Sequence, residues 1–243
     1  MGPISEQIAE NVAGIRRRID DAAMRSGRTA DAVTMIAVSK YLDADSPVLA
    51  GMIEAGCDRL GESRPQHLVE KAQRLREIEM PHEVRWHMIG HLQRNKVRKI
   101  LPIVDLIHSA DSPRIIEAID RIAAEEQLPP VRVLLEVNIS GEEAKHGFSP
   151  GGVARFVEEQ ASQYSNIEIQ GLMCMAGLES DDAATRREFI ALRELRDRLK
   201  QVAPDSVRLE HLSMGMSDDF EIAVEEGATI VRIGHLLFEH VDY

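Results

Sequence analysis

Apolar side chains along this chain form short, β-prone runs separated by longer stretches with helical spacing. Residues 4–25 carry one apolar helix stripe, made of Ile8, Val12, Ile15 and Ile19. Strands are predicted at 33–39, 58–62, 84–89, 104–108, 131–138, 167–174, 207–212 and 229–233. Helical patterns lie between the strands, and the longest covers residues 182–202. The chain therefore predicts a regular alternation of strands and helices.

Capping residues support the same alternation. Three predicted helices begin at a serine followed by proline, in the pairs Ser46-Pro47, Ser112-Pro113 and Ser149-Pro150. Serine can accept from free N–H groups at a helix start, and proline presets φ at the first helical position. Asp218 and Glu221 have the spacing of a capping box. Gly27, Gly56 and Gly227 stand where helices should end.

Eight strands that alternate with helices predict the fold class. We expect an α/β protein with a single (β/α)8 barrel of the TIM type and an extra N-terminal helix, all in one domain over residues 1–243. The main alternative is an open, doubly wound parallel sheet. No G-x-G-x-x-G follows the first predicted strand, which disfavours a dinucleotide-binding fold.

Composition narrows the classes of function. The net charge of −12 argues against a broad nucleic-acid or anionic-membrane surface. Cys57 and Cys174 form no C-x-x-C pair, so neither a disulfide framework nor a metal site is expected. No apolar stretch approaches the length of a membrane span, and the N-terminus lacks the apolar core of a signal peptide. We expect a cytoplasmic monomer.

The first predicted strand ends on Lys40, after the run Met-Ile-Ala-Val-Ser. In a barrel of this type, function collects at the C-terminal ends of the strands. A lysine amine that is partly removed from water loses its proton more readily, and a neutral amine can attack a carbonyl to form a Schiff base. The alternative is that Lys40 is simply the first solvated residue after a strand.

Two neighbouring strand ends have the composition of a phosphate cup. Residues 213–219 are small, hydroxylated and glycine-containing, and Gly234 and His235 follow the last strand. Small residues let backbone N–H groups approach an anion, and a helix start favours negative charge. A phosphate site after the seventh and eighth strands recurs in barrels. The alternative is an ordinary loop with a serine cap.

Arg232 lies within the last apolar strand and needs a partner if it is buried. It either forms a structural ion pair, with Glu136 or Glu62, or faces the ring nitrogen or phosphate of a ligand. Glu136 itself is expected to pair with a cation of the barrel. A lysine, a phosphate cup and a lone arginine around one barrel mouth suggest pyridoxal 5′-phosphate as the cofactor, with its aldehyde bonded to Lys40.

Motifs along nearly the whole chain resemble the pyridoxal phosphate homeostasis protein family. They are AVSK at 37–40, GESRPQ at 61–66, WHMIGHLQRNK at 86–96, VNIS at 137–140, KHG at 145–147, GLM at 171–173, LSMGMSDD at 212–219 and VRIG at 231–234. The resemblance implies a barrel like that of alanine racemase, with the cofactor on Lys40 and Arg232 near the pyridine nitrogen. The cofactor-binding residues we expect are Lys40, Ser63, His87, Asn138, Met173, Ser213, Gly215, Met216, Ser217, Arg232, Gly234 and His235.

Three positions depart from the pattern that this family usually shows. Ser63 stands where the family usually has asparagine, His91 where it often has proline, and His235 where it usually has threonine. The backbone N–H of His235 could still serve a phosphate. His87 and His91 have H-x3-H spacing, but they flank a strand end and a glycine, so no zinc pair is expected from them.

Three functions compete. The first is a cofactor carrier that binds pyridoxal phosphate reversibly, controls its free level and supplies apo forms of pyridoxal phosphate-dependent enzymes. The second is an amino-acid racemase with weak activity; efficient racemisation needs two opposed bases, and Tyr41, beside Lys40, is expected to point away along the chain. The third is a non-catalytic interaction protein, which leaves Lys40 and the 213–219 loop unexplained. We expect no robust catalytic activity.

Overall fold

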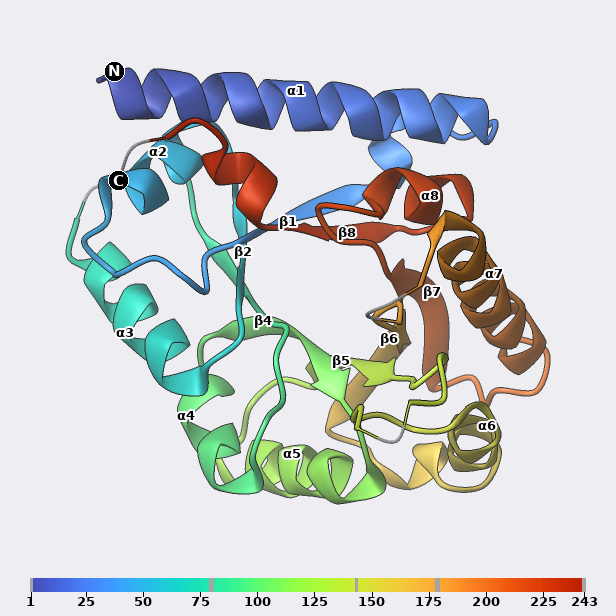
Figure 1. The fold of residues 1–243 in the computed structure, drawn as a ribbon. Coiled ribbons are helices and arrows are strands. Elements are labelled where there is room, and N and C mark those ends of the chain that lie inside the picture. Colours follow the sequence, from blue (N-terminus) through green and yellow to red (C-terminus); the bar gives the residue numbers. More distant parts are fainter. Residues whose placement is uncertain (1, 79–80, 143, 178–179, 242–243) are drawn as a thin grey trace.

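A computed structural model describes residues 2–78, 81–142, 144–177 and 180–241 of the chain. It contains a closed barrel in which the strands follow one another in sequence order from β1 to β8 (Figure 1). All eight strand pairs are parallel. The strands are β1 (Thr34–Val38), β2 (Arg59–Glu62), β3 (Arg85–Met88), β4 (Val104–Ala110), β5 (Val131–Glu136), β6 (Ile167–Met173), β7 (Val207–Ser213) and β8 (Ile230–Ile233).

Helices surround the barrel on its outside (Figure 1). The α-helices are α1 (Pro3–Arg25), α2 (Pro47–Glu54), α3 (Pro65–Arg76), α4 (Val97–Ile100), α5 (Pro113–Glu125), α6 (Pro150–Glu159), α7 (Asp182–Leu199) and α8 (Phe220–Glu225). The 3-10 helices are η1 (Ala30–Ala32), η2 (Arg94–Lys96), η3 (Ala161–Gln163) and η4 (His235–Phe238). In the part of the chain that the structure describes, no helix combines the length and apolar character that crossing a bilayer requires.

The predicted barrel is confirmed, and the open sheet is wrong because β1 pairs with β8, with Thr34 opposite Ile230. Ser46 and Ser149 cap α2 and α6 as predicted. Ser112 precedes α5, but its side chain accepts no cap hydrogen bond; its hydroxyl donates to the neighbouring Asp111 carboxylate.

The capping box predicted from Asp218 and Glu221 does not form. The residue before α8 is Asp219, and its carboxylate accepts from the backbone N–H of Met216 at 2.5 Å. Glu221 pairs with Arg18 on α1. The start of α8 is therefore held by its own preceding turn and by the first helix of the chain.

Helix α1 covers the seam where the first and last strands meet. Its stripe of Ile8, Val12, Ile15 and Ile19 is buried, and the helix packs against α2, α8 and η4. Figure 1 shows it lying across one side of the barrel, outside the ring of the other helices. Burial of these four side chains stabilises barrel closure by joining the two ends of the chain.

The buried side chains form two apolar layers. The larger layer fills the space between the strands and the helices. A smaller cluster consists of Ile36, Leu106, Leu134, Met173 and Ile230, which come from five different strands. Because side chains alternate across a strand, this second cluster fills the inside of the barrel. Charged and polar side chains share that interior, and they set up the site.

Candidate functional site

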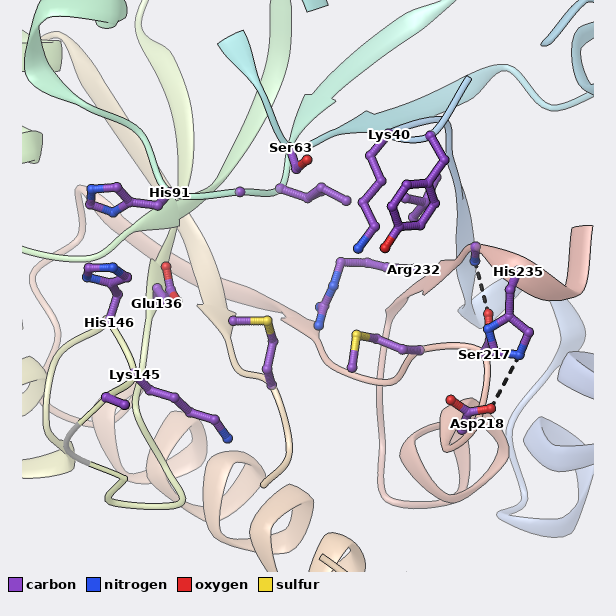
Figure 2. A pocket seen from close by; sticks show the side chains of 18 residues that line it. Lys40, Ser63, His91, Glu136, Lys145, His146, Ser217, Asp218, Arg232 and His235 are labelled. Carbon is purple, nitrogen blue, oxygen red and sulfur yellow. Dashed lines mark hydrogen bonds and ion pairs between the residues drawn. The ribbon is translucent and has the colours of Figure 1, made fainter. Parts of the chain in front are cut away.

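A pocket of about 550 Å³ opens at the C-terminal ends of the strands (Figure 2). It is lined by Val38, Lys40, Tyr41, Ser63, Ile89, Gly90, His91, Glu136, Ala144, Lys145, His146, Met175, Met216, Ser217, Asp218, Arg232, Gly234 and His235. Seven of the twelve residues predicted from the sequence lie in its wall: Lys40, Ser63, Met216, Ser217, Arg232, Gly234 and His235. The other five, His87, Asn138, Met173, Ser213 and Gly215, do not line it.

Lys40 lies in the pocket wall directly after β1, as predicted. The N–H of Ser39 still donates to Gly61 of β2 at 2.9 Å, so strand pairing extends to the residue before the lysine. The chain then turns, with the N–H of Leu42 donating to the Ser39 carbonyl. This turn brings the Tyr41 ring back to 4.8 Å from the Lys40 amine. The expectation that Tyr41 points away was therefore wrong.

A buried ion pair between Lys71 and Glu62 lies next to the backbone that precedes Lys40. The ammonium group of Lys71 on α3 donates to Glu62 at 2.5 Å and to the Ser39 carbonyl at 2.7 Å. The other oxygen of Glu62 accepts from the backbone N–H groups of Ser63 and Arg64. Glu62 is 0% exposed and Lys71 is 2% exposed. This network fixes the ends of β1 and β2, and sequence reasoning missed Lys71.

The predicted phosphate cup presents backbone donors to the pocket. The Ser217 hydroxyl accepts from the backbone N–H of Gly234 at 3.0 Å and keeps its own proton to donate. In the described part of the chain, the backbone N–H groups of Ser217, Asp218 and His235 have no hydrogen-bond partner. A Cβ on Gly234 would meet only Val38, at 3.8 Å, so the space above this glycine is open to a ligand.

Gly215 shapes the cup without lining it. Its φ is +93°, and a Cβ there would approach Ala223 of α8 to 2.6 Å. Its carbonyl accepts from the backbone N–H of Arg232 at 3.0 Å. Gly215 therefore lets the loop pack tightly between α8 and β8. Because α8 has only six residues, the cup depends on individual N–H groups more than on the dipole of a long helix.

Arg232 projects from β8 into the pocket near Lys40 (Figure 2). Its guanidinium donates to the Ser213 hydroxyl at 2.7 Å and to the Cys174 carbonyl at 2.9 Å. The ion pair that the sequence allowed with Glu62 does not form, because Lys71 occupies that carboxylate. Neutral partners leave the positive charge of Arg232 free to act on a ligand.

Two buried histidines continue the chain of hydrogen bonds from Arg232 through the barrel interior. His108 Nδ1 lies 2.8 Å from Ser213 Oγ, and His108 Nε2 lies 2.9 Å from His87 Nδ1. Burial lowers the pKa of His87 to about 3, with help from the charges of Arg59 and Arg85. Burial also lowers the pKa of His108 well below its ordinary value. Both rings are therefore neutral at physiological pH.

The donors in this chain run in one direction. A guanidinium can only donate, so Ser213 accepts from Arg232 and keeps its own proton, which it can donate to His108 Nδ1. In the tautomer that accepts this proton, neutral His108 donates from Nε2 to His87 Nδ1. The far nitrogen of His87, Nε2, is buried and has no partner among the described residues. His87, one of the residues predicted to bind the cofactor, does not line the pocket and lies two hydrogen bonds from Ser213.

Glu136, at the end of β5, was expected to pair with a barrel cation. It is 5% exposed, and among the described residues no hydrogen bond or ion pair holds its carboxyl group. Burial and the nearby charge of Asp111 raise its pKa to about 7, although Arg232 and His91 act in the opposite direction. The prediction was wrong, and the site instead contains a carboxyl group that titrates near neutral pH.

The side chains of Asn138 and Met173 lie outside the pocket wall and contact other parts of the protein. The Asn138 side chain bonds the loop that follows β5, donating to the Glu142 carbonyl at 2.8 Å and accepting from the Gly141 N–H at 3.0 Å. Met173 is buried in the apolar cluster inside the barrel. His91 does line the pocket, while His87 is internal, so the two histidines of the H-x3-H motif lie in different environments.

The chain is similar to curated proteins over almost its whole length. It is 37% identical over 234 residues to the pyridoxal phosphate homeostasis protein of Aquifex aeolicus, covering 96% of this chain and 98% of the relative. It is 35% identical over 237 residues to the protein of the same name from Escherichia coli K12, covering 97% of each chain. No family model matches the chain.

Solved structures with the same fold include a protein that is similar to this chain over nearly its whole length. PipY of Synechococcus elongatus, solved with pyridoxal phosphate bound, matches with a TM-score of 0.81 and 34% identity, covering 95% of this chain and 99% of that chain. Alanine racemase of Bartonella henselae matches with a TM-score of 0.68 and 12% identity, covering 96% of this chain and 58% of that chain. The second match shows a shared barrel fold alone. Identity above one third, across nearly full length, shows that the chain belongs to the pyridoxal phosphate homeostasis protein family.

Proposed function

We propose that this chain binds pyridoxal 5′-phosphate in the pocket at the barrel mouth, as a Schiff base on Lys40, and acts in controlling and carrying the free cofactor. The observation that carries the proposal is the position of Lys40. Its amine shares one pocket with Arg232 and with the cup formed by Ser217, Gly234 and His235. A relative in this family, PipY, was solved with this cofactor bound.

The residues present fit the group. A pocket of about 550 Å³ lies within the usual range for small ligands, about 300–1,000 Å³. The open N–H groups of Ser217, Asp218 and His235, together with the Ser217 hydroxyl, suit a phosphate. Lys40 supplies the amine for the aldehyde, and Arg232 supplies a fixed positive charge for the pyridine ring.

Pyridoxal phosphate can act as an electron sink for carbanions when it is bound to an enzyme. Arg232 works against that chemistry, because a guanidinium donates a hydrogen bond but does not give up its proton. A pyridine nitrogen that accepted this hydrogen bond would therefore stay unprotonated and would withdraw electrons weakly. The neutral hydrogen-bond chain through Ser213, His108 and His87 holds the guanidinium in this role. Weak electron withdrawal by the ring would disfavour carbanion chemistry on the bound cofactor, which suits a protein that carries the cofactor and does not use it for catalysis.

A racemase is the second candidate, and one observation favours it. Tyr41 lines the pocket next to Lys40, so a second acid or base is closer than the sequence suggested. However, Tyr41 is 72% exposed, so its side chain is not held in a buried position opposite the lysine. If Tyr41 acted as the second base, replacement by phenylalanine would remove racemisation of alanine. We expect robust racemisation of alanine neither from the wild type nor from the Tyr41→Phe variant.

Borohydride reduction tests the proposed linkage. Reduction of the cofactor-loaded protein should fix a pyridoxyl group on Lys40, which peptide mass mapping would detect. Lys40→Ala should lose both the label and the visible imine absorbance. Lys145 also lines the pocket, but Glu142 and the Ala176 carbonyl engage its amine, so Lys145→Ala is the matched control. A label on any lysine other than Lys40 would refute the proposed linkage.

The carrier role has its own test. The loaded protein is mixed with the apo form of a pyridoxal phosphate-dependent enzyme, and recovery of that enzyme's activity is followed in time. We expect activation by the loaded wild type and none from the borohydride-reduced protein, whose cofactor cannot leave. A free-cofactor trap in solution distinguishes direct transfer from release followed by rebinding. Activation of the apo enzyme by the reduced protein to the same extent as by the loaded wild type would refute the carrier role.

A further inference from the structure

A cluster of two imidazoles and a carboxylate lies beside the pocket, on the other side of Arg232 from Lys40. His91 follows β3, Asp111 follows β4, and His146 lies in the loop after β5. One potential ligand atom from each residue lies within 4.8 Å of the other two. Figure 2 shows His91 and His146 next to each other and well away from Lys40. Nothing in the proposed cofactor site uses these residues.

Two of the three potential ligands are already in contact. His91 Nδ1 lies 2.8 Å from Asp111 Oδ2. The His91 side chain is 45% exposed, whereas that of Asp111 is 8% exposed and is also held by the Ser112 hydroxyl. A ring nitrogen and a carboxylate oxygen bind a metal only without the proton between them, so an ion that replaces this proton would be held by both atoms at one site. Asp111 is thus a rigid element, and His91 is the adjustable one.

His146 completes the set. Its ring stacks on His91 with the centroids 4.1 Å apart and the planes inclined by 16°. The nitrogen lone pairs lie in the planes of the rings, so two stacked rings point them in parallel directions and not at one common point. Binding of one ion by both rings therefore requires the rings to tilt relative to each other. His91 and His146 are both exposed, which leaves them free to turn. Tetrahedral bonds of about 2.0–2.1 Å place ligand atoms about 3.3 Å apart, so contraction from 4.8 Å is small.

The charge of the surroundings suits a cation. Glu136 lines the same end of the pocket as His91 and His146, and its carboxyl group interacts electrostatically with both Asp111 and His91. The ionised carboxylates of Asp111 and Glu136 repel each other, and a cation bound between them would offset that repulsion, as Arg232 already does in part for Glu136. Imidazole ligands select zinc and its neighbours in the first transition row over magnesium or calcium, which prefer oxygen ligands only.

We propose that His91, Asp111 and His146 form a binding site for one divalent transition-metal ion, such as Zn²⁺, in the wall of the pocket opposite Lys40. Three protein ligands leave at least one coordination position for water or for a ligand in the pocket. The site is independent of the Schiff base, because none of its residues belongs to the Lys40 end of the pocket. It therefore stands or falls separately from the proposed function.

The test measures zinc binding to the protein after removal of pyridoxal phosphate, because the free cofactor itself chelates metals. Competition with a chromogenic zinc chelator should show one ion per chain. We expect His146→Ala and His91→Ala each to weaken binding at least tenfold, and Asp111→Asn to weaken it as well. His240→Gln is the matched control, because the His240 side chain is 80% exposed and lies outside the cluster, with Glu239 Oε1 at 4.0 Å. It should bind zinc like the wild type.

Cobalt supplies a second readout that does not depend on affinity. Co²⁺ in a site of nitrogen and oxygen ligands should give visible absorption bands that His146→Ala removes. Circular dichroism of each metal-free variant checks that it is folded; the two histidines are exposed, so their replacement should leave the fold intact. No zinc binding, or binding that His146→Ala and His91→Ala leave unchanged, would overturn the site. Equal weakening by His240→Gln would indicate adventitious binding only.

Discussion

His108 Nδ1 lies 2.8 Å from the hydroxyl oxygen of Ser213, and the same oxygen accepts from Arg232 at 2.7 Å. One serine therefore joins a neutral ring inside the barrel to the charged group in the pocket wall. All three residues are buried. The arginine is thus positioned by the barrel interior and not by an acidic partner, which preserves its charge for a ligand.

Replacement of Ser213 by alanine should disturb that position. The change leaves His108 Nδ1 and one guanidinium N–H without their partner, which costs about 1–3 kcal/mol for a buried polar group. We expect a lower free energy of unfolding in urea and weaker binding of pyridoxal phosphate in an absorbance titration. Ser149→Ala is the control: it removes the cap of α6, so it lowers stability without touching Arg232. If both variants bind the cofactor equally well, Ser213 has no positioning role.

Loss of the ion pair behind Lys40 should be severe. Lys71→Met leaves the buried charge of Glu62 without a partner, which typically costs about 3–5 kcal/mol. The free energy of unfolding should recover in the double variant Lys71→Met/Glu62→Gln, which removes the charge as well. Arg74→Gln breaks an exposed ion pair on the same helix and should change stability little. A mild effect of Lys71→Met would mean that water reaches Glu62.

Phosphate contacts should dominate cofactor affinity. Pyridoxal lacks the phosphate, so the donors of Ser217, Asp218 and His235 would be desolvated without a partner; we expect roughly 100-fold weaker binding than for pyridoxal phosphate. Gly234→Ala adds a methyl group that meets only Val38 at 3.8 Å. This variant should keep its stability but lose much of the preference for the phosphate. Similar affinities of the wild type for both ligands would place the phosphate elsewhere.

Glu136 should make stability fall as pH rises through neutrality. Burial raises its pKa to about 7 in the folded chain, from a usual value of 4.5. The folded state therefore holds its proton more tightly, and this contribution is complete below about pH 4.5 and lost as pH rises through 7. The loss is roughly 3 kcal/mol for a shift of this size. Glu136→Gln, which cannot ionise, should be more stable than the wild type at pH 8 and similar at pH 5. The measurement is the difference between the two unfolding curves across this range, and a constant difference would show that Glu136 does not titrate there.

Local sequence patterns were sufficient for the barrel. Each predicted strand lies within two residues of the observed one at either end, because buried parallel strands read as apolar runs. The helices α2, α5 and α6 begin at the predicted prolines, since proline fixes φ without losing a needed hydrogen bond. Lys40, Arg232 and residues 216–218 also line the pocket at the barrel mouth, because each lies at or just after the C-terminal end of a strand.

Long-range partners were not predictable in the same way. Lys71 shares a helix stripe with Leu68, Ala72 and Leu75, and a lysine on an apolar stripe was a signal of burial. Its partner, Glu62, depends on how α3 packs on the barrel, which the pattern does not contain. His108 is a polar residue inside the apolar strand β4. Its contact with Ser213 joins β4 to β7, two strands that are not neighbours in the sheet. The contact therefore forms only across the interior of the closed barrel.

The pairing of β1 with β8 connects residues almost two hundred positions apart, Thr34 with Ile230. During synthesis on the ribosome, Ser217, Arg232 and His235 emerge almost two hundred residues after Lys40. A nascent chain therefore has the amine long before it has the pocket, and contacts this distant in sequence form slowly. Because a ligand that spans the seam binds only the closed barrel, it stabilises closure by mass action. The ligand would then act as a late folding aid, and a shortage of it would lengthen the time that an open barrel is exposed to proteases.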